Sequence, residues 1–176
     1  MRKENENYLR MSLEDLESSK ILYHSKKYPQ AIFFLQQSIE KTTKGITGIF
    51  KHGHKTLDIY KKIVDKETKE RIKETFERSK IKIDNEKILL AIIEIIKSRI
   101  SEIDSGKSNL KVGKITVPNF LLQQILSSHV NLTRYPKGEY NPLTRYTKDH
   151  FLIKHYDKIY ELQKCCLDEC FKFISS

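Results

Sequence analysis

Residues 27–41 read KYPQAIFFLQQSIEK, and the apolar side chains of this stretch recur every three or four positions. Such spacing gathers them on one face of a helix. Pro29 suits the first turn of this helix, and Gly45 and Gly48 lie where it should end. The pattern predicts an amphipathic helix with an inward stripe of Ala31, Phe34, Leu35, Ser38, Ile39 and Thr42.

The preceding segment, residues 7–26, has a similar pattern. Leu9, Leu13, Leu16 and Tyr23 are separated by three, four or seven positions, which predicts another amphipathic helix. Only a few residues connect it to the helix that follows, so the two helices are expected to fold back on each other as an antiparallel hairpin.

The rest of the chain also favours helices. Residues 81–103 contain eleven Ile or Leu side chains, from which two stripes can be drawn: a first of Leu89, Ile93, Ile96, Ile100 and Ile103, and a second of Ile88, Ile92 and Ile95. Two apolar stripes need more than one bundle face to cover them, so this helix is either central or part of a subunit interface. Residues 137–146 are rich in Gly, Pro and Asn and predict an irregular surface loop. Further helices are expected after His54, from about Val117 to Ser127 and from about Lys148 to Ile174.

The composition agrees with an all-α protein. The chain has 176 residues, of which only 6 are Gly and 4 are Pro, whereas sandwiches and barrels need many turn residues. We expect a single domain over residues 1–176, with an insert-like charged region at about residues 65–113. The 33 Lys and Arg exceed the 23 Asp and Glu by ten, and the excess is spread along the chain rather than clustered.

Targeting and redox signals are weak in this sequence. Residues 1–7 are polar and precede no apolar segment, which predicts a cytoplasmic protein. No apolar run approaches the length of about 20 residues that spans a membrane, so no membrane association is expected. Cys165, Cys166 and Cys170 are crowded within one predicted helix, which favours small buried hydrophobic side chains over disulfides or metal ligands.

The sequence lacks the spacings of phosphate-binding loops, dinucleotide-binding loops, zinc proteases and calcium-binding loops, so neither a cofactor nor a metal is expected. His52 and His54 are better explained as polar residues at a helix start than as metal ligands. The last predicted helix has an inward apolar stripe that includes His155 and Phe173. The position of His155 on this stripe favours a core or interface histidine.

Arg145 and His150 are the strongest candidates for chemistry. They flank the predicted start of the last helix, where Thr147 or Asp149 could provide the cap and place His150 in the first turn. The guanidinium could hold a phosphate while the imidazole transfers a proton, which suffices for cleavage of RNA without a metal. His150 is expected to project away from the apolar stripe of this helix, so core packing does not account for it. A solvated arginine beside a histidine at a helix start is the ordinary alternative.

Three segments resemble the HEPN family. Residues 13–22 read LEDLESSKIL, residues 28–41 read YPQAIFFLQQSIEK, and His54 to Leu57 read HKTL. The first two are similar to the first helix of the family and to its second helix, which has the pattern Y-x-x-A-x-F-x-x-Q-Q-x-x-E-K. The third stands near where the H-x-L element of the family would follow. The resemblance implies an antiparallel up-and-down bundle of four to five main helices with short additional helices.

The resemblance also implies a function. Many family members are homodimeric, metal-independent RNases with an R-x(4–6)-H motif near the dimer interface, which Arg145 and His150 match as catalytic residues. Residues 132–136, LTRYP, look like a further element of the family and contain Arg134. Arg134, Tyr146 and Lys148 are the expected substrate-binding residues. Tyr146 departs from the pattern, because active members usually have Asn, Asp or His directly after the arginine.

Three hypotheses follow. The first is a homodimeric endoribonuclease of a toxin-antitoxin or defence system that acts on RNA. The second is a non-catalytic subunit that binds a minimal nucleotidyltransferase, with Tyr146 marking the loss of cleavage. The third is an interaction protein whose basic surface serves only solubility. Gln36, Glu40 and Thr43 form a polar side of the second helix, which favours structural contacts within the bundle over a groove.

Overall fold

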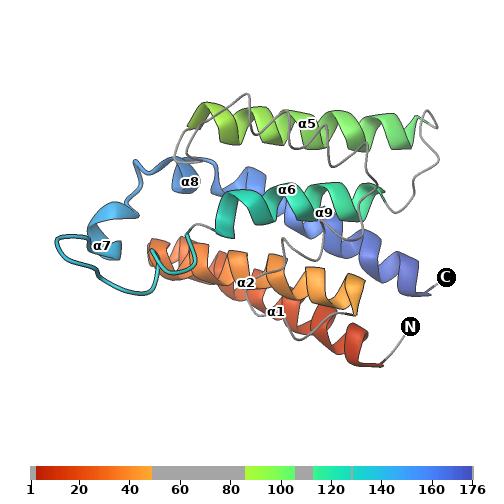
Figure 1. Cartoon of the computed structure of the whole chain (residues 1–176), viewed down its shortest axis with the longest axis horizontal. Helices are drawn as coiled ribbons and strands as arrows, with labels where there is room; N and C mark the ends of the chain where they lie inside the picture. The colour runs from red at the N-terminus through yellow and green to blue at the C-terminus, as the bar shows by residue number, and fades with distance from the viewer. Residues whose placement is uncertain (1–2, 49–85, 106–112, 128, 176) are drawn as a thin grey trace.

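The computed structural model describes residues 3–48, 86–105, 113–127 and 129–175, and in these ranges the secondary structure is helical without a strand. The long helices lie side by side and alternate in direction, so that α1 runs against α2 and α6 runs against α9 (Figure 1). The prediction of an all-α bundle is therefore confirmed. The helices are α1 (Lys3–His24), α2 (Tyr28–Thr47), α5 (Glu86–Asp104), α6 (Gly113–Ser127), α7 (Pro142–Arg145), α8 (Phe151–Lys154) and α9 (Tyr156–Ser175).

Helices α1 and α2 form the predicted hairpin. The turn between them is closed by hydrogen bonds from the backbone N–H groups of Lys26 and Lys27 to carbonyls in the last turn of α1. Lys26 has a φ of 58°, a left-handed conformation that usually favours glycine. Helix α2 ends at Thr47, and its C-cap residue, Gly48, also has a positive φ. Close packing of the hairpin requires Gly45, because a Cβ there would lie 2.7 Å from atoms of Leu9.

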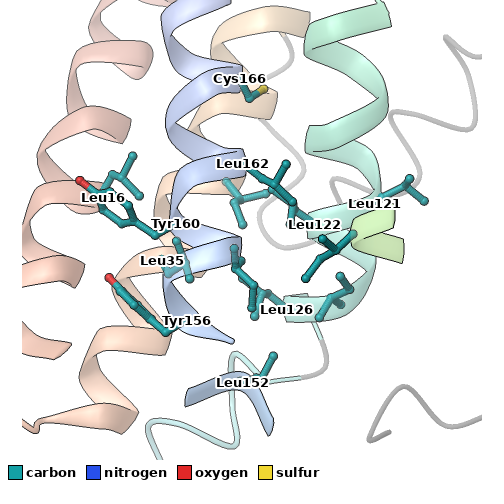
Figure 2. Packing of buried hydrophobic residues seen from close by; sticks show 14 of the residues in the cluster. Leu16, Leu35, Leu121, Leu122, Leu126, Leu152, Tyr156, Tyr160, Leu162 and Cys166 are labelled. Carbon is teal, nitrogen blue, oxygen red and sulfur yellow. The ribbon is translucent and has the colours of Figure 1, made fainter. Parts of the chain in front are cut away.

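The apolar core lies where the α1–α2 hairpin meets α6 and α9. Figure 2 shows Leu16 and Leu35 from the hairpin together with Leu122, Leu126 and Tyr156 from the other two helices. These five side chains are fully buried. The predicted stripe of α2 is confirmed, since all of its members are buried except Phe34, which is partly buried.

A polar layer crosses this core. Ser12 of α1 bonds to the hydroxyl of Thr42 in α2 at 2.7 Å, and the side-chain amide of Gln163 in α9 donates to Thr42 at 2.8 Å and to Ser38 at 3.0 Å. All four side chains are fully buried. A shift of one helix along another would leave these buried polar groups without hydrogen-bond partners, which is energetically costly. The layer therefore fixes the register of α1, α2 and α9.

The polar side of α2 makes structural contacts. Gln36 donates to the Glu40 carboxylate at 3.3 Å, and Lys44 forms a salt bridge with the same carboxylate at 2.8 Å. Thr43 donates to the side-chain oxygen of Asn119 in α6 at 2.6 Å. These contacts agree with the structural interpretation of Gln36, Glu40 and Thr43 rather than with a groove.

Helix α5 packs along α6 at the edge of the described bundle (Figure 1). Leu89, Ile93 and Ile96, from the first predicted stripe, are fully buried. The second stripe is divided, because Ile92 is buried whereas Ile95 is 41% exposed. One face of α5 is therefore sufficient to dock it, and the expectation of a central helix is not met among the described elements.

Two helix boundaries differ from the prediction. Helix α6 begins at Gly113 rather than near Val117, so Pro118 lies inside it, and the additional turn buries Ile115 against α9. The last predicted helix is interrupted at His155, whose ring binds Glu86 of α5 at 2.6 Å. The spacing of apolar residues continues through this interruption, so periodicity alone could not reveal it.

Helix α9 confirms some of the expected buried positions and not others. Cys166 and Cys170 are buried as predicted, but Cys165 is exposed. Phe173 was expected on the inward face of the last helix, and it is 62% exposed. His52, His54 and the charged stretch at 65–82 lie outside the described residues. No helix in the described ranges has the length and apolar character needed to cross a membrane.

Candidate functional site

The segment between α6 and α9 positions His150. Its backbone is extended, and Nδ1 of its ring accepts a hydrogen bond from the N–H of Leu152 at 3.2 Å. His150 is thus the N-cap of α8 itself, which corrects the expectation that Thr147 or Asp149 caps the helix and that His150 lies in its first turn. The cap fixes one ring nitrogen, so the direction of the imidazole is set by the helix start.

The ring of His150 is held among other rings. This corrects the expectation that it projects away from the apolar stripe. It stacks on Phe151 with 4.7 Å between ring centroids, and the ring of Tyr146 lies at the same distance on a tilt of 44°. The ring of His129 approaches edge-on at 5.8 Å. These contacts restrict the rotation of an imidazole that is only partly buried.

Beneath His150 lies a buried histidine–tyrosine pair. The hydroxyl of Tyr146 and Nδ1 of His129 are 2.5 Å apart, and both residues are 1% exposed. Tyr146 was expected to bind substrate, but its burial leaves almost no surface for that contact. The geometry instead gives it a supporting role, because it connects His150 to the core of the bundle.

His129 was not among the predicted site residues. It stands alone in the sequence, 17 positions before Tyr146, and no local pattern marks it. It joins the site because α6 ends just before it and the chain then returns through α7. This contact depends on tertiary structure, which explains why sequence reasoning missed it.

Arg145 is the last residue of α7 and is partly buried. Its guanidinium carbon lies 5.5 Å above the ring of Tyr140, a cation–π distance. The hydroxyl of Tyr140 in turn donates to the backbone carbonyl of Leu132 and closes the loop. Arg145 and His150 therefore belong to one segment but are supported by different rings. Residues 137–146, expected to be irregular throughout, include the short helix α7.

The other predicted substrate-binding residues are exposed. The guanidinium of Arg134 lies about equally far from two rings, at 5.0 Å from Phe33 and 4.9 Å from Tyr135. Lys148 lies in the turn before α8 and lines an open cleft of about 640 Å³. Tyr146 forms part of the wall of this cleft, which places Lys148 close to the aromatic support of His150.

No group of three or more His, Cys, Asp or Glu side chains in the described part of the chain is arranged to hold a metal ion. The side chains that the site assembles are instead aromatic rings, imidazoles and cations. Such a set suits binding of a phosphate group and proton transfer beside it.

The protein is an antiparallel helical bundle. Its candidate phosphate-directed site consists of an arginine and a histidine at the turn into the last helices. A family model for the HEPN domain matches residues 5–166. The chain therefore belongs to the HEPN domain family. No curated protein and no solved structure matches it significantly.

The supporting role of Tyr146 predicts the effect of removing its hydroxyl. Tyr146→Phe should lower the free energy of unfolding by about 1–3 kcal/mol, because His129 then loses a buried hydrogen bond. Chemical denaturation measures the effect. Tyr135→Phe is the matched control, because Tyr135 is 55% exposed, and its stability should change by less than about 0.5 kcal/mol.

Proposed function

We propose that this HEPN-domain protein is a metal-independent endoribonuclease in which Arg145 and His150 act on one phosphodiester of RNA. The observation that supports this best is the fixed imidazole of His150. It combines a helix cap on one nitrogen with ring contacts to Tyr146 and Phe151. A preorganised imidazole is what general acid–base catalysis requires, whereas a solvated histidine would have no such support.

The chemistry assigned to the site is an internal transesterification. The 2′-oxygen of the ribose bonds to phosphorus, the bond from phosphorus to the 5′-oxygen breaks, and the products are a 2′,3′-cyclic phosphate and a 5′-hydroxyl. One proton leaves the 2′-hydroxyl and one reaches the leaving 5′-oxygen. The guanidinium of Arg145 stabilises the charge on the non-bridging oxygens.

The cap assigns the proton transfer to one ring atom of His150. Because Nδ1 accepts from Leu152, the capped ring is neutral and its proton is on Nε2. To protonate the leaving 5′-oxygen, the ring has to release the cap, take up a second proton on Nδ1 and then donate the Nε2 proton. To accept the proton of the 2′-hydroxyl, the ring has to release the cap and place its proton on Nδ1. A homodimer would supply a second copy of His150, so that one copy is the acid and the other the base.

Further RNA contacts are assigned to Arg134 and Lys148. Both are exposed, and Arg134 lies beside the rings of Phe33 and Tyr135, on which a base could stack. We assign the protein to a toxin-antitoxin or defence system, with RNA as its substrate.

The proposal is tested by incubating the purified protein with RNA in excess EDTA. We expect cleavage at an unchanged rate and fragments ending in 2′,3′-cyclic phosphate. Arg145→Lys should slow cleavage about 10²-fold, because lysine keeps the charge but loses the planar pair of donors. Arg10→Lys is the matched control, since Arg10 lies on the exposed face of α1 in a salt bridge with Glu6.

Three outcomes would contradict the proposal. Cleavage that EDTA abolishes would indicate a metal-dependent activity. Cleavage that survives in Arg145→Lys at the wild-type rate would remove Arg145 from the site. Intact RNA together with tight binding to a co-purified nucleotidyltransferase would favour the non-catalytic alternative, in which the same bundle is a partner subunit.

A further inference from the structure

A cleft separates the turn between α1 and α2 from the segment that carries Arg145. Its nine lining residues come from two stretches, 26–30 and 143–148, which are more than 110 positions apart in the sequence. The α1–α2 turn was not among the sequence-predicted site residues. The bundle brings it next to α7 at the end of the molecule opposite the two termini (Figure 1).

The rim of this cleft is positively charged. Lys26 and Lys27 on one side and Lys148 on the other are exposed, and no acidic residue is among the nine that line the cleft. Within the described part of the chain, none of the three lysines is in a salt bridge. Three unneutralised cations around one hollow favour an anionic ligand.

The cleft also offers apolar surface. Leu143 is 67% exposed at its edge, and Tyr28 is partly exposed. A small inorganic anion would not use these side chains, whereas a single nucleic-acid strand presents both phosphates and base or sugar faces. The mixture therefore suits a single strand better than an isolated phosphate.

The position of the cleft connects it to His150. Tyr146 lines the cleft and also contacts the ring of His150, with 4.7 Å between centroids. The cleft and the imidazole therefore have Tyr146 as a common neighbour. An RNA strand whose reacting phosphate lies at His150 would bring a neighbouring phosphate over the lysines.

We propose that the cleft between the α1–α2 turn and residues 143–148 binds the phosphates of single-stranded RNA next to the bond that is cleaved, with Lys26, Lys27 and Lys148 as the contacts. This inference rests on the proposed function and adds the α1–α2 turn to the substrate-binding surface. Binding at this turn determines on which side of the cleaved bond the protein contacts the RNA strand.

The test measures affinity separately from cleavage. A fluorescent single-stranded RNA of twelve nucleotides, methylated on every 2′-oxygen, cannot be cleaved and is titrated with the full-length protein. The triple variant Lys26→Ala, Lys27→Ala and Lys148→Ala should bind about 10- to 100-fold more weakly at 0.1 M salt. The slope of log affinity against log salt should fall by about 2, because each lost phosphate contact contributes about 0.7.

The matched control removes three exposed lysines elsewhere. The triple variant Lys97→Ala, Lys164→Ala and Lys172→Ala has the same net charge, but its positions lie on α5 and α9 outside the cleft. Its affinity should change less than about twofold. The single variant Lys26→Gly tests whether a loss of affinity is caused by misfolding, since glycine suits the left-handed backbone at residue 26. Its melting temperature should be unchanged or raised by up to about 3 °C, while its affinity for RNA should fall.

The outcomes separate this inference from the function on which it rests. Equal weakening in both triple variants, or wild-type affinity in the cleft variant, would overturn the cleft assignment even if unmethylated RNA is still cleaved through His150. Binding that depends on the three lysines without any cleavage would support the cleft and contradict the nuclease. If RNA is neither bound nor cleaved, both proposals fail.

Discussion

Replacing His150 with asparagine should lower the rate of RNA cleavage about 10²- to 10⁴-fold, the usual contribution of a positioned acid or base. Asparagine is a good N-cap, so it can accept the hydrogen bond from Leu152 that His150 accepts now. The variant therefore keeps α8 but has no group that transfers a proton. Single-turnover cleavage of a labelled RNA measures the effect.

His150→Ala separates catalysis from the cap. It should lose the same activity and in addition about 0.5–2 kcal/mol of stability, because alanine cannot cap α8. His24→Ala is a control for the loss of a histidine, since His24 is exposed at the end of α1. If His150→Asn cleaves RNA like the wild type, the imidazole has no role in the reaction and His150 is only a cap.

Replacing Tyr156 with alanine should lower the free energy of unfolding by about 3–5 kcal/mol, as is usual for a large aromatic side chain in a core. Tyr156 is fully buried, stacks on Tyr23 with 4.0 Å between centroids, and bonds to the hydroxyl of Ser19 at 2.6 Å. Burial also raises the pKa of Tyr156, so the phenol stays neutral. Its removal would leave a cavity where α9 meets the α1–α2 hairpin.

Tyr156→Phe distinguishes the ring from its hydroxyl. It should cost only about 1 kcal/mol, because Ser19 still donates to the carbonyl of Ala31. Tyr135→Ala, at an exposed position, should change stability by less than about 0.5 kcal/mol. Urea denaturation followed by circular dichroism gives all three values. A loss below about 1 kcal/mol in Tyr156→Ala would show that this junction is not part of the stable core.

The site was predictable only in part. Spacing placed Arg145 and His150 on one short segment before the last long helix, because only five positions separate them. Their supports could not be predicted in this way. The contact of His129 with Tyr146 and the approach of Lys26 to Lys148 across the cleft join segments that are far apart in the chain.

The sequence by itself determined the long helices and the hairpin of α1 and α2, since helical periodicity and the proline and glycine signals act within a few residues. Tertiary structure alone decided that His150 caps a helix, that Tyr146 is buried, and that the helix after it is interrupted at His155. In each case the local conformational preference of the sequence is weaker than the contacts that the residue makes with distant parts of the bundle. The spacing of apolar residues is the same whether or not these contacts form, so the sequence pattern cannot predict them and only the folded bundle reveals them.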